Sequence, residues 1–197
     1  MNVLDRPSYL AAVIICLVAA MATAQSPRER VSFNEDWLFQ KDDPKDAAGI
    51  LAYPNIKDWV RSTGNEFVLT SSAVKSGRPA GNLGENVAYT RSDFDDASWR
   101  QLNLPHDWAI EGDFIQELPG ETGKRPFAGV GWYRKHFQIA ERDKWNRFYI
   151  DFDGAMAYPT VWLNGQFIGG WTYGYSSFRL DLTPYLGYGS ENVIAVR

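Results

Sequence analysis

The chain has 197 residues, a formal net charge of −4, two histidines and one cysteine. Because positive and negative side chains are interspersed without a basic stripe, the composition argues against a nucleic-acid partner. The two histidines, His106 and His136, lack zinc-binding spacing, and neither a phosphate-binding loop nor a G-x-S-x-G motif is present, so we expect no metal ion and no cofactor.

The first 24 residues have the features of a secretory signal peptide. Arg6 precedes an apolar run over residues 10–22, which at 13 residues is short for a membrane span, and small residues at 22–24 suit cleavage. The alternative is a retained anchor. We expect an exported protein, periplasmic or extracellular, that has no membrane contact after cleavage. Loss of residues 1–24 would also remove Cys16, leaving no disulfide.

Two contrasting segments follow. Residues 31–40 predict a first strand with Phe33 and Trp37 in the core. Residues 41–92 are polar and interrupted by proline and glycine, so we expect a long irregular insertion with a short helical turn near residues 56–60.

Short stretches of alternating apolar and polar residues predict strands in the rest of the chain. They cover residues 99–105, 129–139, 147–154, 160–163, 166–169, 178–182 and 192–197. The pair Asn164-Gly165 favours a two-residue type I′ turn, because both positions need a positive φ, and so predicts a hairpin. We therefore expect residues 25–197 to form one all-β domain, an antiparallel β-sandwich or jelly roll.

The segment LPHDWAIEGDF, residues 104–114, places a histidine, a carboxylate and a tryptophan side by side. Adjacent residues of an extended chain point to opposite faces, so His106 and Asp107 do not suit the oriented pair of a hydrolytic triad. Asp107 either binds a ligand or caps a turn. His106 either binds a ligand or packs against and orients a neighbour, and Trp108 either stacks on a sugar or joins the core.

A second candidate is the loop GGWTYGYSSF, residues 169–178. Trp171, Tyr173 and Tyr175 alternate among small and polar residues, so one side of this loop presents aromatic rings. We expect these rings to contact either a carbohydrate or an adjoining domain.

Four motifs together resemble the N-terminal sugar-binding jelly roll of glycoside hydrolase family 2, in particular that of secreted β-galactosidases. They are FDDASWRQLNLPHDWAIEGDF, GVGWYRKHFQI, DFDGAMAYPTVWLNGQFIGG and YGYSSFRLDLTPYL followed by ENVIAVR. The resemblance covers about residues 31–197 and implies a galactose-binding-like β-sandwich. In the family, this domain precedes an immunoglobulin-like domain and a (β/α)8 barrel that carries both catalytic glutamates.

The resemblance implies that the chain supplies contacts to a β-linked carbohydrate and to the downstream domains, but no catalytic residue. It places Asp107 at hydroxyls of the terminal sugar, with His106 and Trp108 beside it. In the best-studied branch an aspartate near the aromatic loop belongs to a metal-linked site. Here no acidic residue lies between Gly165 and Leu180, so we expect no metal ligand.

The expected function is thus that of an N-terminal fragment of a secreted retaining exo-glycosidase acting on terminal β-galactosides, inactive by itself. The alternative is a stand-alone, non-catalytic carbohydrate-binding module. A third hypothesis is a structural sandwich that docks on another chain.

Overall fold

The computed structural model describes residues 28–47, 49–64, 77–126 and 129–197. The predicted signal peptide lies outside these residues. The chain divides into two units, residues 1–33 and 34–197, and every described helix and strand belongs to the second unit. Within the described ranges, no helix has the length and apolar character needed to cross a membrane.

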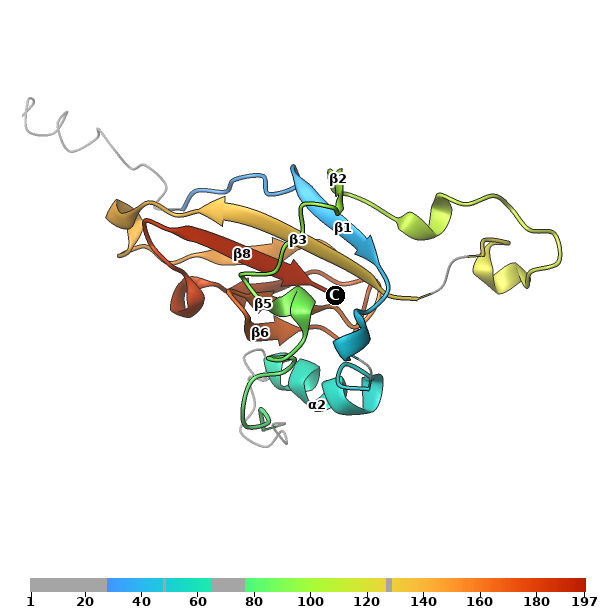
Figure 1. Cartoon of the computed structure of the whole chain (residues 1–197), viewed down its shortest axis with the longest axis horizontal. Coiled ribbons are helices and arrows are strands. Elements are labelled where there is room, and N and C mark those ends of the chain that lie inside the picture. The colour runs from blue at the N-terminus through green and yellow to red at the C-terminus, as the bar shows by residue number, and fades with distance from the viewer. Residues whose placement is uncertain (1–27, 48, 65–76, 127–128) are drawn as a thin grey trace, which may run out of the picture. The chain divides into compact units, whose positions relative to one another are not determined.

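A six-stranded antiparallel sheet with the order β2-β1-β3-β8-β5-β6 forms the centre of the second unit (Figure 1). Its strands are β1 (Trp37–Lys41), β2 (Arg100–Leu102), β3 (Gly131–Gln138), β5 (Thr160–Leu163), β6 (Gln166–Gly170) and β8 (Glu191–Val196). A second sheet pairs β4 (Tyr149–Phe152) with β7 (Phe178–Asp181), also antiparallel. The predicted antiparallel sandwich is confirmed.

Burial along the strands follows their position in the sheet. In β3, Trp132 and Arg134 are buried while Tyr133 and Lys135 are half-buried, as expected for a strand with one face in the core. Strands β5 and β8 lie inside the sheet and show almost continuous burial, because both of their faces are covered.

The hairpin between β5 and β6 forms as predicted. Asn164 has a φ of 52° and Gly165 a φ of 80°, the pair of positive angles that a type I′ turn requires. The Asn164 side chain also binds outside the hairpin: its amide nitrogen donates to Tyr185 O at 2.9 Å, and its oxygen accepts from Val193 N at 2.9 Å. The turn is thereby tied to β8 and to the chain after β7.

The first strand begins later than predicted. It starts at Trp37, which is buried in the core as expected, whereas Phe33 precedes the strand and is only partly buried. The prediction of a strand from residue 31 is wrong because, among the described residues, the ladder pairing of this segment begins at Trp37: residues 37–39 pair with β2 and residues 38–41 with β3.

Helix α2 (Tyr53–Thr63) is much longer than the predicted turn near residues 56–60. Pro54 occupies its first turn, where a missing N–H costs nothing, and its buried residues Ile56, Trp59 and Val60 have helical spacing. The helix lies beside β6 (Figure 1), where the Thr63 hydroxyl accepts a hydrogen bond from Gly170 N at 3.0 Å. Part of segment 41–92 is thus regular structure within the core.

Two stacked indoles form the centre of that core. The rings of Trp132 and Trp162 lie 5.3 Å apart with an interplanar angle of 22°. Each indole N–H finds an acceptor in residues 41–92: Trp132 donates to Asp43 Oδ1 at 2.9 Å and Trp162 to Leu83 O at 2.6 Å. Segment 41–92 therefore supplies both apolar packing and polar partners to the sheet.

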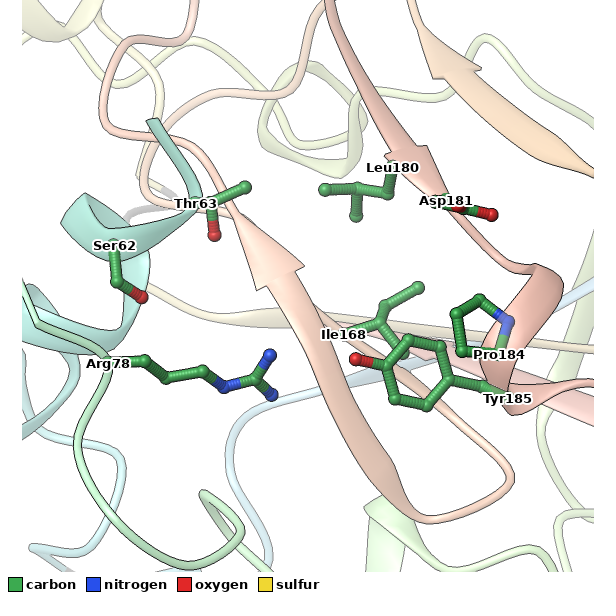
Figure 2. Close-up of a pocket in the computed structure, with 8 residues that line it drawn as sticks. All are labelled: Ser62, Thr63, Arg78, Ile168, Leu180, Asp181, Pro184 and Tyr185. Atoms are coloured by element: carbon green, nitrogen blue, oxygen red, sulfur yellow. The ribbon is translucent and has the colours of Figure 1, made fainter. Parts of the chain in front are cut away.

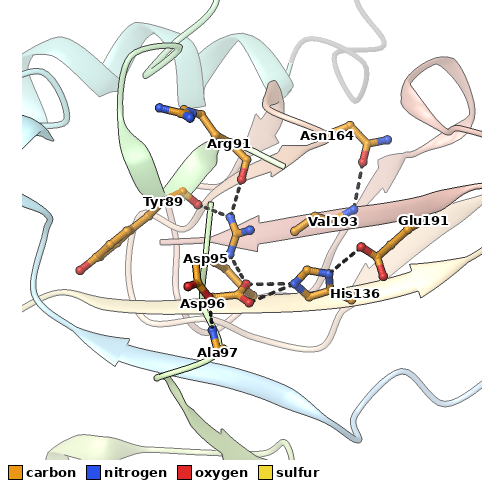
Figure 3. Close-up of polar contacts among 10 residues, drawn as sticks. Tyr89, Arg91, Asp95, Asp96, Ala97, His136, Asn164, Glu191 and Val193 are labelled. Carbon is orange, nitrogen blue, oxygen red and sulfur yellow. Dashed lines mark hydrogen bonds and ion pairs between the residues drawn. The ribbon is translucent and has the colours of Figure 1, made fainter. Parts of the chain in front are cut away.

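An ionic cluster, buried at Arg134 and Asp96, joins the loop before β2 to β3 and β8. The Arg134 side chain is fully buried and donates to Asp96 Oδ2 at 2.6 Å and to Tyr89 O at 2.6 Å. His136 lies between two carboxylates, with Nε2 3.0 Å from Asp96 Oδ2 and Nδ1 3.1 Å from Glu191 Oε2 (Figure 3). Because charged side chains are rarely buried without partners, this cluster fixes the loop to the sheet.

The remaining described helices are single 3₁₀ turns. They are η1 (Lys45–Ala47), η3 (Ala88–Thr90), η4 (Trp108–Ile110), η5 (Gly120–Thr122), η6 (Glu141–Asp143) and η7 (Thr183–Tyr185).

Candidate functional site

His106, Asp107 and Trp108 lie in the loop that connects β2 to β3. Leu104 N donates to Asn34 O at 2.7 Å, and the following peptide bond to Pro105 is cis. After Asp107 the chain forms η4. The backbone is therefore held on both sides of the His106-Asp107 pair.

His106 is the best-fixed side chain of this loop. Its side chain is only 9% exposed, with Nδ1 2.9 Å from Tyr133 Oη and Nε2 3.0 Å from Glu111 Oε1. The edge-on ring of Phe39 lies 4.8 Å away. Both ring nitrogens therefore have partners, which agrees with the predicted packing or orienting role.

The pKa shifts of Glu111 and Tyr133 indicate the protonation states of the two hydrogen-bond partners of His106. Hydrogen bonds from Arg100, at 2.8 Å, and from His106 lower the pKa of Glu111 to about 2. Burial, together with the negative charges of Asp107 and Glu111, raises the pKa of Tyr133 to about 12. Tyr133 thus remains a phenol, and the ionised Glu111 accepts a hydrogen bond from the Nε2–H of His106.

Asp107 is exposed and is the N-cap of η4, where its Oδ1 accepts a hydrogen bond from Ala109 N at 3.0 Å. The turn-capping role considered from sequence is therefore present. Among the described residues, no hydrogen bond reaches the other oxygen, Oδ2. Capping and ligand binding are compatible, because the cap orients the carboxylate and leaves one oxygen facing solvent.

Trp108 is half-buried and packs against the start of β3. A Cβ placed on Gly131 would come within 2.7 Å of the Trp108 Nε1, so only glycine lets the indole approach this closely. Lys41 Nζ lies 4.7 Å from the centre of the ring. These contacts support a mainly structural role for Trp108.

The site has three further members that sequence analysis did not single out, Arg100, Glu111 and Tyr133. The sheet register explains their meeting: Phe39 of β1 pairs with Arg100 of β2 on one side and with Tyr133 of β3 on the other. Glu111 carries the one local signal, a carboxylate five residues after His106. We name Arg100, His106, Glu111 and Tyr133 the His106 cluster.

The aromatic loop between β6 and β7 separates into two parts. Trp171 is half-buried, donates from Nε1 to Ser176 Oγ at 2.8 Å and stacks on Phe178 with ring centroids 5.9 Å apart. Tyr173 and Tyr175 are 60% and 77% exposed, and their ring centroids are 5.7 Å apart. The loop thus presents two rings outward and one inward.

No group of three or more metal-binding side chains is present in the described ranges.

Comparison with known proteins points to one family. Residues 119–197 match the family model described as glycosyl hydrolases family 2, sugar binding domain. A β-galactosidase of Bacteroides ovatus is 39% identical over 173 residues, covering 87% of this chain and 15% of that protein. A β-glucuronidase of Formosa agariphila is 28% identical over 174 residues, covering 87% of this chain and 14% of that protein.

The fold agrees with this match. A crystal structure of a β-glycosidase from Bacteroides vulgatus has a TM-score of 0.59 and 32% sequence identity, covering 86% of this chain and 17% of that one. The chain thus spans about a sixth of the length of these relatives. With its antiparallel sandwich and its sequence match, the chain belongs to glycoside hydrolase family 2, as the sugar-binding domain found at the N-terminus of the family's enzymes.

Proposed function

We propose that this chain is the N-terminal part of an exported, retaining exo-glycosidase that hydrolyses terminal β-galactosides. The 39% identity with a β-galactosidase supports the substrate class. The signal-like residues 1–24 support export. In this proposal the chain binds and positions the sugar, and other segments of the enzyme break the glycosidic bond.

The single observation that carries the sugar-binding role is the exposed carboxylate of Asp107 on a loop fixed by His106, whose side chain is only 9% exposed. The cap to Ala109 N orients the carboxylate, and Oδ2 is left to accept a hydrogen bond from a sugar hydroxyl. Hydrogen bonds to ionised acceptors are stronger than hydrogen bonds between neutral groups. One such contact therefore favours a sugar with a hydroxyl at this position over a sugar without one.

Catalysis requires residues beyond these. A retaining glycosidase uses two carboxyl groups about 5 Å apart, one as acid and base and the other as nucleophile. We assign both to a downstream (β/α)8 barrel, which follows an immunoglobulin-like domain in the proposed enzyme. The exposed rings of Tyr173 and Tyr175 are proposed to face one of these domains.

The proposal is tested by comparing the 197-residue chain with the full-length product of the gene that encodes it. Both are assayed on nitrophenyl β-galactoside and nitrophenyl β-glucuronide. We expect no turnover by the chain alone, and a higher kcat/KM on the galactoside than on the glucuronide for the full-length product.

Two results would contradict the proposal. Hydrolysis by the chain alone would place catalytic residues within it. A preference for the glucuronide would mean that the enzyme acts on β-glucuronides and not on β-galactosides. If the gene ends with this chain and the chain binds β-galactosides without hydrolysing them, the stand-alone module is the better description.

A further inference from the structure

The turn that carries Asp107 is short. Its hydrogen bonds run from Ala109 N to Asp107 Oδ1 at 3.0 Å and from Ile110 N to Asp107 O at 3.3 Å. A single 3₁₀ turn holds its shape weakly by itself, because its hydrogen bonds are few and poorly aligned. A fixed orientation of Asp107 therefore needs contacts from outside the turn.

A side-chain bridge between His106 and Glu111 closes this turn. Glu111 is the C-cap residue of η4, and its N–H donates to Trp108 O at 3.3 Å. Its side chain runs back to the start of the turn, where Oε1 lies 3.0 Å from Nε2 of His106, the residue before Asp107. The two ends of the turn are thus joined through side chains as well as through the backbone.

Arg100 connects this bridge to the sheet. Its Nη1 donates to Glu111 Oε2 at 2.8 Å, so the two carboxylate oxygens of Glu111 have different partners. Arg100 belongs to β2, whereas His106 is held from its other ring nitrogen by Tyr133 of β3. Hydrogen bonds from Arg100 and then His106 lower the pKa of Glu111 to about 2, so the carboxylate is ionised at neutral pH and both bonds are charge-assisted.

We propose that Glu111 is a positioning residue for the sugar contact of Asp107. The inference rests on the proposed function, in which Asp107 Oδ2 accepts a hydrogen bond from a sugar hydroxyl. Glu111 acts without touching the sugar, because its two oxygens are turned toward Arg100 and His106. It keeps His106, and with it the backbone at Asp107, in one place. A displacement of about 1 Å can cost about 100-fold in rate, so such a residue affects turnover from outside the contact.

The test is a double-mutant cycle on kcat/KM of the proposed full-length enzyme with nitrophenyl β-galactoside. Glu111→Ala should lower kcat/KM about tenfold, because Asp107 is no longer held in place. Glu111→Gln should lower kcat/KM less, because the amide oxygen still accepts a hydrogen bond from His106. In the Asp107→Ala background no carboxylate remains to be positioned, so Glu111→Ala should change kcat/KM by less than about twofold.

Two controls separate positioning from stability. Glu117 is an exposed carboxylate of the same loop, and its side chain makes no hydrogen bond or ion pair with the described residues, so Glu117→Ala should leave kcat/KM unchanged. Arg78 is a structural anchor elsewhere: it donates to Phe167 O beside the cavity between the end of α2 and strands β6 and β7 (Figure 2). Arg78→Gln should lower the midpoint of urea unfolding and leave kcat/KM of the folded enzyme unchanged.

Three results overturn the inference. The first is a kcat/KM of Glu111→Ala within about twofold of the unmodified enzyme, and the second is an undiminished effect of Glu111→Ala in the Asp107→Ala background. The third is an equal loss of kcat/KM in Glu111→Ala and in either control.

Failure of the inference and failure of the proposed function give different results. If Asp107→Ala lowers kcat/KM but Glu111→Ala does not, Asp107 contacts the sugar without help from Glu111, and only the inference is overturned. If Asp107→Ala leaves kcat/KM unchanged, the proposed sugar contact is wrong, and the inference fails with it.

Discussion

At the scale of single residues, the His106 cluster determines how the loop presents Asp107. The Tyr133 hydroxyl is hydrogen-bonded to His106 Nδ1, so Tyr133→Phe removes one partner and leaves a part-buried ring nitrogen unsatisfied. We expect a loss of about 1–3 kcal/mol in the free energy of unfolding, measured by urea denaturation. Tyr149→Phe is the control, because Tyr149 is 50% exposed; equal losses in the two variants would contradict the assigned hydrogen bond.

Gly131 allows the close packing of Trp108. In Gly131→Ala the new methyl group would lie 2.7 Å from Trp108 Nε1 and 3.1 Å from Phe39 Cε2, so the indole must move. Overpacking of this kind costs about 1–3 kcal/mol, and we expect a matching loss of stability with a change in tryptophan fluorescence. Gly120→Ala, where a Cβ meets nothing within 4 Å, should show neither effect.

At the scale of elements, the predicted strands were recognisable where one face is buried. Alternation located β3 and β4, and the Asn164-Gly165 pair located the hairpin. The length of helix α2 was underestimated because proline and glycine dominated the interpretation of residues 41–92. The spacing of Ile56, Trp59 and Val60 was the available signal for a helix.

The hairpin turn stabilises the fold through the Asn164 side chain as well as through its backbone angles. Asn164→Gly keeps a residue that tolerates positive φ but removes the hydrogen bonds to Tyr185 O, Asn192 Oδ1 and Val193 N. At about 1 kcal/mol for each bond, we expect a loss of about 2–3 kcal/mol on chemical denaturation. Gly165→Ala should cost less, about 1 kcal/mol, because it strains φ alone. The reverse order of these losses would contradict the side-chain role.

The ionic cluster of Figure 3 predicts a pH dependence of stability. Burial opposes protonation of His136, but hydrogen bonds to Asp96 and then Glu191 outweigh it and raise the His136 pKa. A folded pKa above the unfolded value of about 6.5 means that the stabilisation is complete below that pH and is lost as pH rises through the folded pKa. Burial by itself would raise the pKa of Asp96, but hydrogen bonds from Arg134 and His136 outweigh burial, and the net effect is a lowered pKa. Asp96 therefore stays ionised in the pH range where His136 titrates.

The measurement is urea unfolding of the unmodified chain and of His136→Gln at about pH 6 and about pH 9. We expect the stability difference between the two proteins to be larger at the lower pH. Glu191→Gln should reduce this pH dependence without abolishing it, since Asp96 remains. A difference that grows with pH would have the wrong sign for a charged His136 held between carboxylates.

At the scale of the whole molecule, the site combines local and long-range features. The segment around Asp107 was visible in the sequence because His106, Asp107 and Trp108 are neighbours. The positions of these three residues relative to Arg100 and Tyr133 could not be predicted from the sequence, because Arg100 and Tyr133 are brought together by the pairing of β1 with both β2 and β3. The cap at Ala109 was one of the two roles that sequence left open for Asp107.

The proposed contact between Asp107 and the terminal sugar is tested most directly by kcat/KM of Asp107→Asn in the proposed full-length enzyme, on nitrophenyl β-galactoside. Asparagine retains the cap of η4 but loses the negative charge, so folding should be preserved. Loss of a charge-assisted hydrogen bond predicts a decrease in kcat/KM of about 10- to 100-fold. A value within about twofold of the unmodified enzyme would contradict a role for Asp107 in holding the sugar.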